Sequence, residues 1–152
     1  MTVLISPWAQ TLKNGQPNPK NYPFWKQLIE LIDRPIIQVG VAKELQLVEH
    51  MRRDLSLSEL QQLIEQCDAW IAVDSFFQHY CWHLGKPGIV LWGQSDPLIF
   101  GHHENINLLK DRAYLRSEQF WLWEQATYRE DCWVAPSEVI VHLNRLLENK
   151  EI

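Results

Sequence analysis

Residues 69–79 read A-W-I-A-V-D-S-F-F-Q-H and show how the fold is built. The first five are apolar throughout, which is typical of a strand that is buried on both faces of a sheet. Asp74 and Ser75 follow directly, and residues of these types commonly begin a helix, here an aromatic one that runs to about Leu84. A buried strand that turns at once into a helix is the repeating unit of α/β proteins with a parallel sheet.

The same alternation of strands and helices extends in both directions from this stretch. Further apolar runs predict strands at residues 2–5, 36–39, 45–48, 88–92 and 105–109. Helical spacing of apolar residues predicts helices at 23–32, 56–67 and 136–147. The second of these helices begins with a capping box, Ser56 followed three residues later by Glu59. We therefore predict an α/β fold, a single Rossmann-like domain over residues 1–152 whose mainly parallel sheet is covered by helices.

Composition excludes several classes of protein. The net charge is −5 and no dense Lys/Arg cluster occurs, so we expect no nucleic-acid binding. No apolar run approaches the roughly 18 to 20 residues that span a bilayer, and the N-terminus lacks the pattern of a signal peptide. We therefore expect a cytoplasmic protein without a membrane span.

The cysteines and histidines do not predict a metal site. Cys67, Cys81 and Cys132 form no C-x-x-C pair and are too scattered for a disulfide framework. No carboxylate or cysteine completes a metal-binding set with the histidines at 79, 83, 102 and 103. We expect reduced thiols, no metal and no cofactor.

The loops that leave the carboxyl ends of the strands are where a parallel α/β sheet binds ligands. The loop after Val73 is the most informative, because Asp74 and Ser75 lie where a helix begins and His79 lies one turn further along, on the side of Ser75. Free backbone N–H groups at a helix start attract a diphosphate. The alternative is that Asp74 or Ser75 merely caps the helix.

Residues 55–93 resemble the C-terminal, nucleotide-sugar-binding domain of heptosyltransferase-type glycosyltransferases of family 9, which is half of a GT-B fold. The order of elements is the same, and D-S-F-F-Q-H at 74–79 resembles the family's D-S/T-G-x-x-H. The run I-I-Q-V-G-V-A-K-E at 36–44 resembles a G-x-x-x-E segment of that domain. Residues 3–32 and 134–147 resemble its opening and closing elements, so the resemblance covers most of the chain.

The resemblance implies a donor site for a nucleotide-diphosphate sugar. It implies that Asp74, Ser75 and His79 face the diphosphate, that Lys13 or Lys20 contacts a phosphate, that Glu44 contacts the ribose or base, and that Gly93 and Gln94 lie near the transferred sugar. The two lysines, Glu44 and the His102-His103 pair can equally be ordinary surface residues.

Two departures from the family's pattern affect this interpretation. Phe76 replaces a glycine and could narrow the site, and the segment between Gly40 and Asp54 is short. The family's other half, which supplies acceptor binding and the catalytic base, is not represented in this sequence. His79 and His102 are weak candidates for a base, although nothing in the sequence locates an acceptor near them.

Three functions follow from these observations. The first is a glycosyltransferase-like domain that binds a nucleotide-diphosphate sugar and works with a separately encoded N-terminal half or as a homo-oligomer. The second is a non-catalytic binding or scaffold module that keeps the fold, and the third is a hydrolase or transferase of a free nucleotide that uses His79. Aromatic residues near the C-terminus suit either a core or an interface with another chain, and they are Phe120, Trp121, Trp123, Tyr128 and Trp133.

Overall fold

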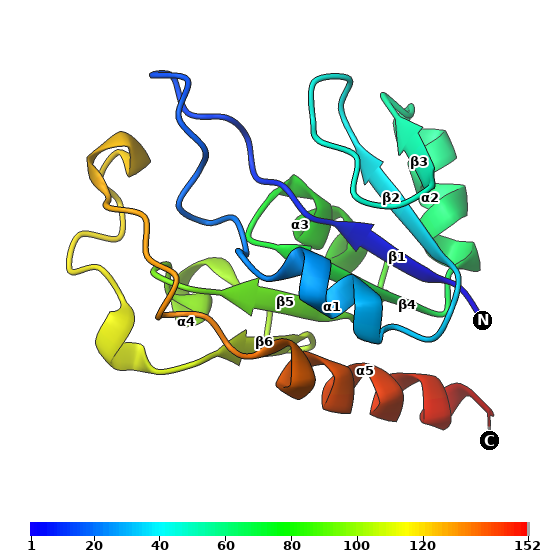
Figure 1. Cartoon of the computed structure of the whole chain (residues 1–152). Helices are drawn as coiled ribbons and strands as arrows, with labels where there is room; N and C mark the ends of the chain where they lie inside the picture. Colours follow the sequence, from blue (N-terminus) through cyan, green and yellow to red (C-terminus); the bar gives the residue numbers. More distant parts are fainter. Residues whose placement is uncertain (152) are drawn as a thin grey trace.

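The chain folds into three layers, a parallel sheet between two layers of helices (Figure 1). The computed structural model describes residues 1–151. All neighbouring strands are parallel and lie in the order β3-β2-β1-β4-β5-β6. The strands are β1 (Val3–Ser6), β2 (Ile36–Gly40), β3 (His50–Arg53), β4 (Ala69–Val73), β5 (Ile89–Trp92) and β6 (Ile106–Leu109). This confirms the predicted α/β class.

The helices cover the sheet in two pairs. One face is covered by α1 (Trp25–Leu31) and α5 (Pro136–Glu151), and the other by α2 (Leu57–Gln66) and α3 (Phe76–His83) (Figure 1). A short helix, α4 (Pro97–Phe100), follows β5 and was not predicted. The segment between β6 and α5 contains only two 3-10 turns, Arg112–Tyr114 and Trp123–Gln125.

The central strand β4 shows why a continuously apolar sequence is needed here. Ile71 and Val73 contribute to the core under α1 and α5, whereas Trp70 and Ala72 contribute to the core under α2 and α3. All five residues of β4 are buried. Gly88 leaves room for the Trp70 indole, because a Cβ atom at position 88 would overlap the ring.

The ends of the helices follow their sequence signals. Ser56 and Glu59 exchange the hydrogen bonds of the predicted capping box at the start of α2. Pro136 is the first residue of α5, and Val139, Leu143 and Leu147 are buried one turn apart along one side of that helix.

The predicted strand at 45–48 is wrong, because the strand beside β2 is His50–Arg53. Residues of the predicted segment form hydrogen bonds with side chains instead of a strand. The Leu45 carbonyl accepts from Gln38 Nε2 and from Trp8 Nε1, each at 2.9 Å, and the Leu47 amide donates to Gln38 Oε1 at 2.7 Å. A buried glutamine therefore replaces the backbone ladder at this point.

The strand order reverses between β1 and β4, which places a ligand-binding crevice at the carboxyl ends of these strands. Two long irregular segments lie at that end of the sheet, residues 7–24 after β1 and residues 110–133 before α5 (Figure 1). None of the helices in the described part of the chain is long and apolar enough to cross a membrane.

Candidate functional site

Asp74 joins three loops at the reversal point of the sheet. It follows β4 directly and is buried, with 5% of its surface exposed. Its Oδ2 lies 3.1 Å from Lys20 Nζ of the β1–α1 loop and accepts a hydrogen bond from Ser95 Oγ, 3.2 Å away in the loop after β5. Its Oδ1 accepts from Gln78 Nε2 of α3 at 2.7 Å. The carboxylate is thus paired with a cation and hydrogen-bonded on both oxygens.

Neither Asp74 nor Ser75 caps the start of α3 through its side chain. Ser75 occupies the capping position, but its hydroxyl donates to the Val73 carbonyl at 3.3 Å and makes no capping hydrogen bond. Asp74 is engaged by Lys20, Gln78 and Ser95. The capping alternative is therefore wrong, and no cap side chain accepts a hydrogen bond from the first-turn N–H groups of α3.

Phe76 is the first residue of α3. Its ring is 61% exposed and stacks on Tyr80, one turn further along, with ring centroids 5.7 Å apart and an interplanar angle of 15°. The ring therefore packs against the next turn of the helix. Tyr80 is in turn hydrogen-bonded through its hydroxyl to the Leu57 carbonyl of α2.

The two candidate lysines have different environments. Lys20 reaches Asp74, whereas Lys13 is exposed and its backbone N–H donates to Glu124 Oε1 at 3.1 Å. Asn18 orders the loop around Lys20, because its side chain donates to the Gln10 carbonyl and accepts from the Lys20 amide. A buried asparagine therefore sets the conformation from which Lys20 crosses to the end of β4.

Glu44 is engaged by its own loop. Its Oε1 accepts from the Val41 amide at 2.6 Å, and Arg53 Nη1 donates to the carbonyls of Val41, Ala42 and Glu44. Burial raises the pKa of the Glu44 carboxyl above its ordinary value, although the Val41 amide opposes this. The structure does not bring Glu44 into the Asp74 network.

His79 and His102, which the sequence suggested separately, are in contact. His79 Nδ1 lies 2.8 Å from His102 Nε2, and the Trp82 indole stacks on the His102 ring with centroids 4.4 Å apart. Burial and the neighbouring His79 lower the pKa of His102. His79 lies on the exposed side of α3, and His102 comes from the loop that leads from α4 to β6.

Gly93 and Gln94 contact residues that follow β6. A Cβ atom at Gly93 would lie 2.7 Å from Cζ2 of Trp133, so close packing alone accounts for glycine here. Gln94 is buried, and its Nε2 donates to the Thr127 carbonyl at 2.9 Å. Trp133 is itself 3% exposed and packs edge-on against Tyr22, so the interface interpretation is wrong for this tryptophan.

Segment 110–133 also contributes Arg116, which the sequence did not indicate, and Trp123, which the sequence indicated only as a core or interface residue. The Trp123 ring has two cations over it, Lys20 Nζ at 5.2 Å and the Arg116 guanidinium at 4.1 Å from its centroid. Gln78 and Ser95, which bind Asp74, were also missed. The contact of Ser95 with Asp74 has no spacing signal, because the two residues are 21 apart in the sequence, whereas Gln78 lies four residues after Asp74, about one helical turn away.

Comparison with known proteins identifies the family. The sequence profile of glycosyltransferase family 9 (heptosyltransferase) matches residues 41–130, which is more than half of the chain. The chain belongs to glycosyltransferase family 9. This confirms the resemblance seen in the sequence, and the matched range includes Asp74, Ser75, His79 and Gln94 but not the loop that carries Lys20.

Solved structures share the fold of this family 9 chain. The E. coli ADP-heptose lipopolysaccharide heptosyltransferase II matches 99% of the chain over 47% of its own length, with 20% identity and a TM-score of 0.68. A family 9 glycosyl transferase from Veillonella parvula matches 98% over 46% of its length, with 16% identity and a TM-score of 0.69.

A third solved structure is the dodecameric, iron-containing heptosyltransferase TibC in complex with ADP-D-β-D-heptose. It matches 97% of the chain over 45% of its own length, with 10% identity and a TM-score of 0.63. The chain therefore spans about half the length of the solved structures that it matches. No curated protein matches it in sequence.

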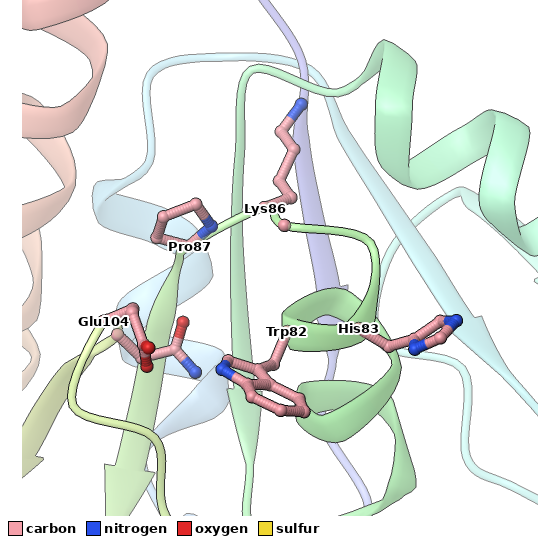
Figure 2. A pocket seen from close by; sticks show the side chains of 7 residues that line it. Trp82, His83, Lys86, Pro87 and Glu104 are labelled. Atoms are coloured by element: carbon pink, nitrogen blue, oxygen red, sulfur yellow. The ribbon is translucent and has the colours of Figure 1, made fainter.

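A separate cavity of about 400 Å³ lies at the opposite end of the strands of this family 9 domain, where β5 and β6 begin (Figure 2). Trp82, Pro87 and Glu104 line it, whereas the Lys86 ammonium and the His83 ring point away from it (Figure 2). Lys86 Nζ instead donates to the carbonyls of Glu65 and Cys67. Within residues 1–151, no group of three or more His, Cys, Asp or Glu side chains is arranged to hold a metal ion.

Proposed function

We propose that the chain binds a nucleotide-diphosphate sugar at the carboxyl ends of β1 and β4, as the donor-binding half of a family 9 glycosyltransferase. The observation that carries this proposal is the Lys20 ammonium held 3.1 Å from Asp74 beside the uncapped start of α3. Cations and free helix N–H groups are the partners that a diphosphate prefers.

The charges in this network favour an anionic ligand. Asp74 holds Lys20 in place, but an ammonium has three N–H donors, and the Lys20 side chain remains 22% exposed. The first-turn N–H groups of α3 add donors without adding a counter-charge. When a glycosyl bond breaks, negative charge grows on the departing diphosphate, and fixed donors of this kind stabilise it.

The ligand class is supported by the solved relative TibC, whose structure contains ADP-D-β-D-heptose. An ADP-sugar is therefore the first ligand to test on this chain. Glycosyl transfer also needs an acceptor and a base. Because the chain spans about half of the solved structures, we propose that a second half or a second copy supplies them.

Apolar side chains exposed near the carboxyl ends of the strands suit such an association. Leu98 is 81% exposed and Phe120 82% exposed, and the neighbouring Phe100 ring packs edge-on against Phe120 at 5.5 Å. Sedimentation of the purified chain, alone and mixed with a candidate N-terminal half, measures the association. A monomer of 18.0 kDa under all these conditions would contradict it.

Calorimetric titration tests the donor site. ADP, UDP, GDP and CDP and their sugar conjugates are titrated into the wild-type chain, Lys20→Gln, and the matched control Lys26→Gln on the exposed side of α1. We expect one nucleotide family to bind, and Lys20→Gln to weaken binding about ten-fold or more because a charge-assisted hydrogen bond is lost. Failure of every nucleotide to bind, or equal losses in the two variants, would overturn the proposal.

The second candidate function is a non-catalytic module. The observation that favours it is that Lys20, Gln78 and Ser95 already satisfy the Asp74 carboxylate from within the chain. In that case the network serves to join three loops. Lys20→Gln would then lower the free energy of unfolding, and the wild-type chain would bind no nucleotide.

A further inference from the structure

A cavity of about 450 Å³ lies between the loop after β5 and the irregular segment that precedes α5. It differs from the cavity in Figure 2, which lies at the opposite end of the strands, where β5 and β6 begin. It also differs from the Asp74 network, since neither Asp74 nor Lys20 lines it. Its lining includes Gln94, Arg116, Glu118, Trp121, Thr127 and Arg129.

Arg116 is the charged group in this cavity that has unused donor capacity. Its Nε donates to the Glu118 carbonyl and its Nη2 to the Trp121 carbonyl, each at 2.7 Å, and its guanidinium lies over the Trp123 ring. These contacts fix the plane of the guanidinium. Its Nη1 is buried without a hydrogen-bond partner, and within residues 1–151 no carboxylate forms an ion pair with it.

Other arginines of the same segment are paired. Arg129, which also lines the cavity, donates to both oxygens of Asp131 at 2.9 and 2.8 Å, and Arg112 donates to both oxygens of Asp96 at 3.0 and 2.8 Å. An unpaired buried donor on a cation is costly unless an acceptor binds it. A guanidinium recognises carboxylate and phosphate groups through paired donors.

The remaining lining suits a hydroxylated molecule. Gln94 contributes an amide, Ser117 a hydroxyl and the backbone at Thr127 further polar atoms. The Trp121 ring is 55% exposed and offers an apolar face. Glu118 is exposed, so solvent screens its charge.

We propose that this cavity is a second ligand site, which binds a small oxyanion carried by a sugar through Arg116. The oxyanion is a carboxylate or a phosphate monoester. The site does not depend on nucleotide binding at Lys20, and it goes beyond the proposed donor function.

Titration with three probes of similar size tests the proposal. The probes are glucuronate, glucose 1-phosphate and uncharged glucose. Their binding is measured through the NMR chemical shifts of the backbone amides. We expect one or both anionic probes to bind at millimolar concentration and to shift the amides of residues 94 and 116–129, whereas glucose does not bind. Comparison of the two anions distinguishes a carboxylate from a phosphate ligand.

Variants identify the group that binds the anion. Arg116→Gln is expected to weaken binding about ten-fold or more, and Arg129→Gln by about two-fold, because Asp131 already pairs with Arg129. Lys26→Gln, on the exposed side of α1, should leave the affinity for these probes unchanged. Because neither Asp74 nor Lys20 lines this cavity, a failure of nucleotide binding alone would not affect this proposal.

Arg116 also supports its own segment, so a second variant is needed. Trp121→Ala removes a half-exposed ring from the cavity while leaving the Trp121 carbonyl in place, and we expect it to weaken binding several-fold in a folded chain. The proposal is overturned if neither anion binds the wild-type chain. It is also overturned if glucose binds equally well, or if Arg129→Gln weakens binding as much as Arg116→Gln.

Discussion

Residues 55–93 and residues 110–133 are held together by different interactions. The first region consists of α2, β4, α3 and β5. Its backbone N–H and C=O groups are hydrogen-bonded mainly within the helices and between neighbouring strands. The second has only two 3-10 turns. Short-range turns and side chains satisfy its backbone groups, and Gln119, for example, donates to the carbonyls of Gln94 and Arg116.

The two regions also differ in how their aromatic residues are used. The two strand tryptophans of the first, Trp70 and Trp92, are fully buried, whereas Phe120 and Trp121 in the middle of the second are 82% and 55% exposed. Phe76 at the start of α3 and Trp133 at the end of the second region are the exceptions, at 61% and 3% exposed. We infer that residues 55–93 contribute most to the free energy of unfolding, whereas residues 110–133 form a surface over the carboxyl ends of the strands. Three predictions test this division.

The largest effect is expected from Trp70→Ala. The indole is fully buried, packs edge-on against Phe77 and donates to the Lys86 carbonyl at 3.0 Å, so its removal should cost about 3–5 kcal/mol of unfolding free energy. Trp121→Ala is the matched substitution in the second region and should change stability by less than about 0.5 kcal/mol. Urea denaturation measures both, and similar losses would contradict the division.

An intermediate, local effect is expected from Gln119→Ala. Its side chain accepts from the Asp96 amide and donates to two carbonyls, so its loss should loosen residues 112–129 by about 1–3 kcal/mol. Amide hydrogen exchange should accelerate there and remain slow in β4 and β5.

Gln125→Ala, at an exposed position of the same segment, is the control for this substitution and should alter exchange little. Equal acceleration of exchange in β4 after Gln119→Ala would show that the two regions unfold as one unit.

The smallest effect concerns pH and lies at the boundary of the two regions. Burial and His79 hold the pKa of His102 below its usual 6.5, while Glu104 opposes and His103 adds to this. Between the lowered pKa and 6.5 the unfolded chain binds more protons than the folded chain, so stability rises with pH across this window and falls on acidification.

The thermal midpoint of the wild-type chain should therefore fall as the pH is lowered from 7.5 to 5.5. In His102→Gln the midpoint should fall by less. His142→Gln, on α5, should leave the size of the fall unchanged. If the thermal midpoint of His102→Gln fell by the same amount as that of the wild-type chain, the His79–His102 pair would not be the cause of the pH dependence.

The sequence predicted the secondary structure correctly where residues interact with neighbours that are close in the sequence. The strand at 69–73, the capping box of α2 and the Pro136 start of α5 all follow local patterns. The error at 45–48 arose because Gln38, seven or more residues away, takes the hydrogen bonds of that segment. A side chain that replaces a ladder leaves no periodic signal.

The candidate site shows the same limit. Asp74 was identified because it follows a buried strand at the start of a helix, and Lys20 was one of two lysines, with Lys13, that the family resemblance implied as phosphate contacts. Their contact, and the absence of a cap on α3, depend on how separate loops meet. Arg116 could not be identified, because its unpaired Nη1 is defined by three-dimensional surroundings alone.

The position of β1 has a consequence for synthesis of the chain. β1 is made before the other five strands yet lies in the middle of the sheet, and the helix that packs beside α1 is α5, which is made after all six strands. On the ribosome, Trp25 and Leu28 of α1 therefore lack the α5 residues of their shared core, Val139 and Leu143, until all six strands have been made. A nascent chain that stalls before residue 136 carries one uncovered apolar face, which is the kind of surface that chaperones bind.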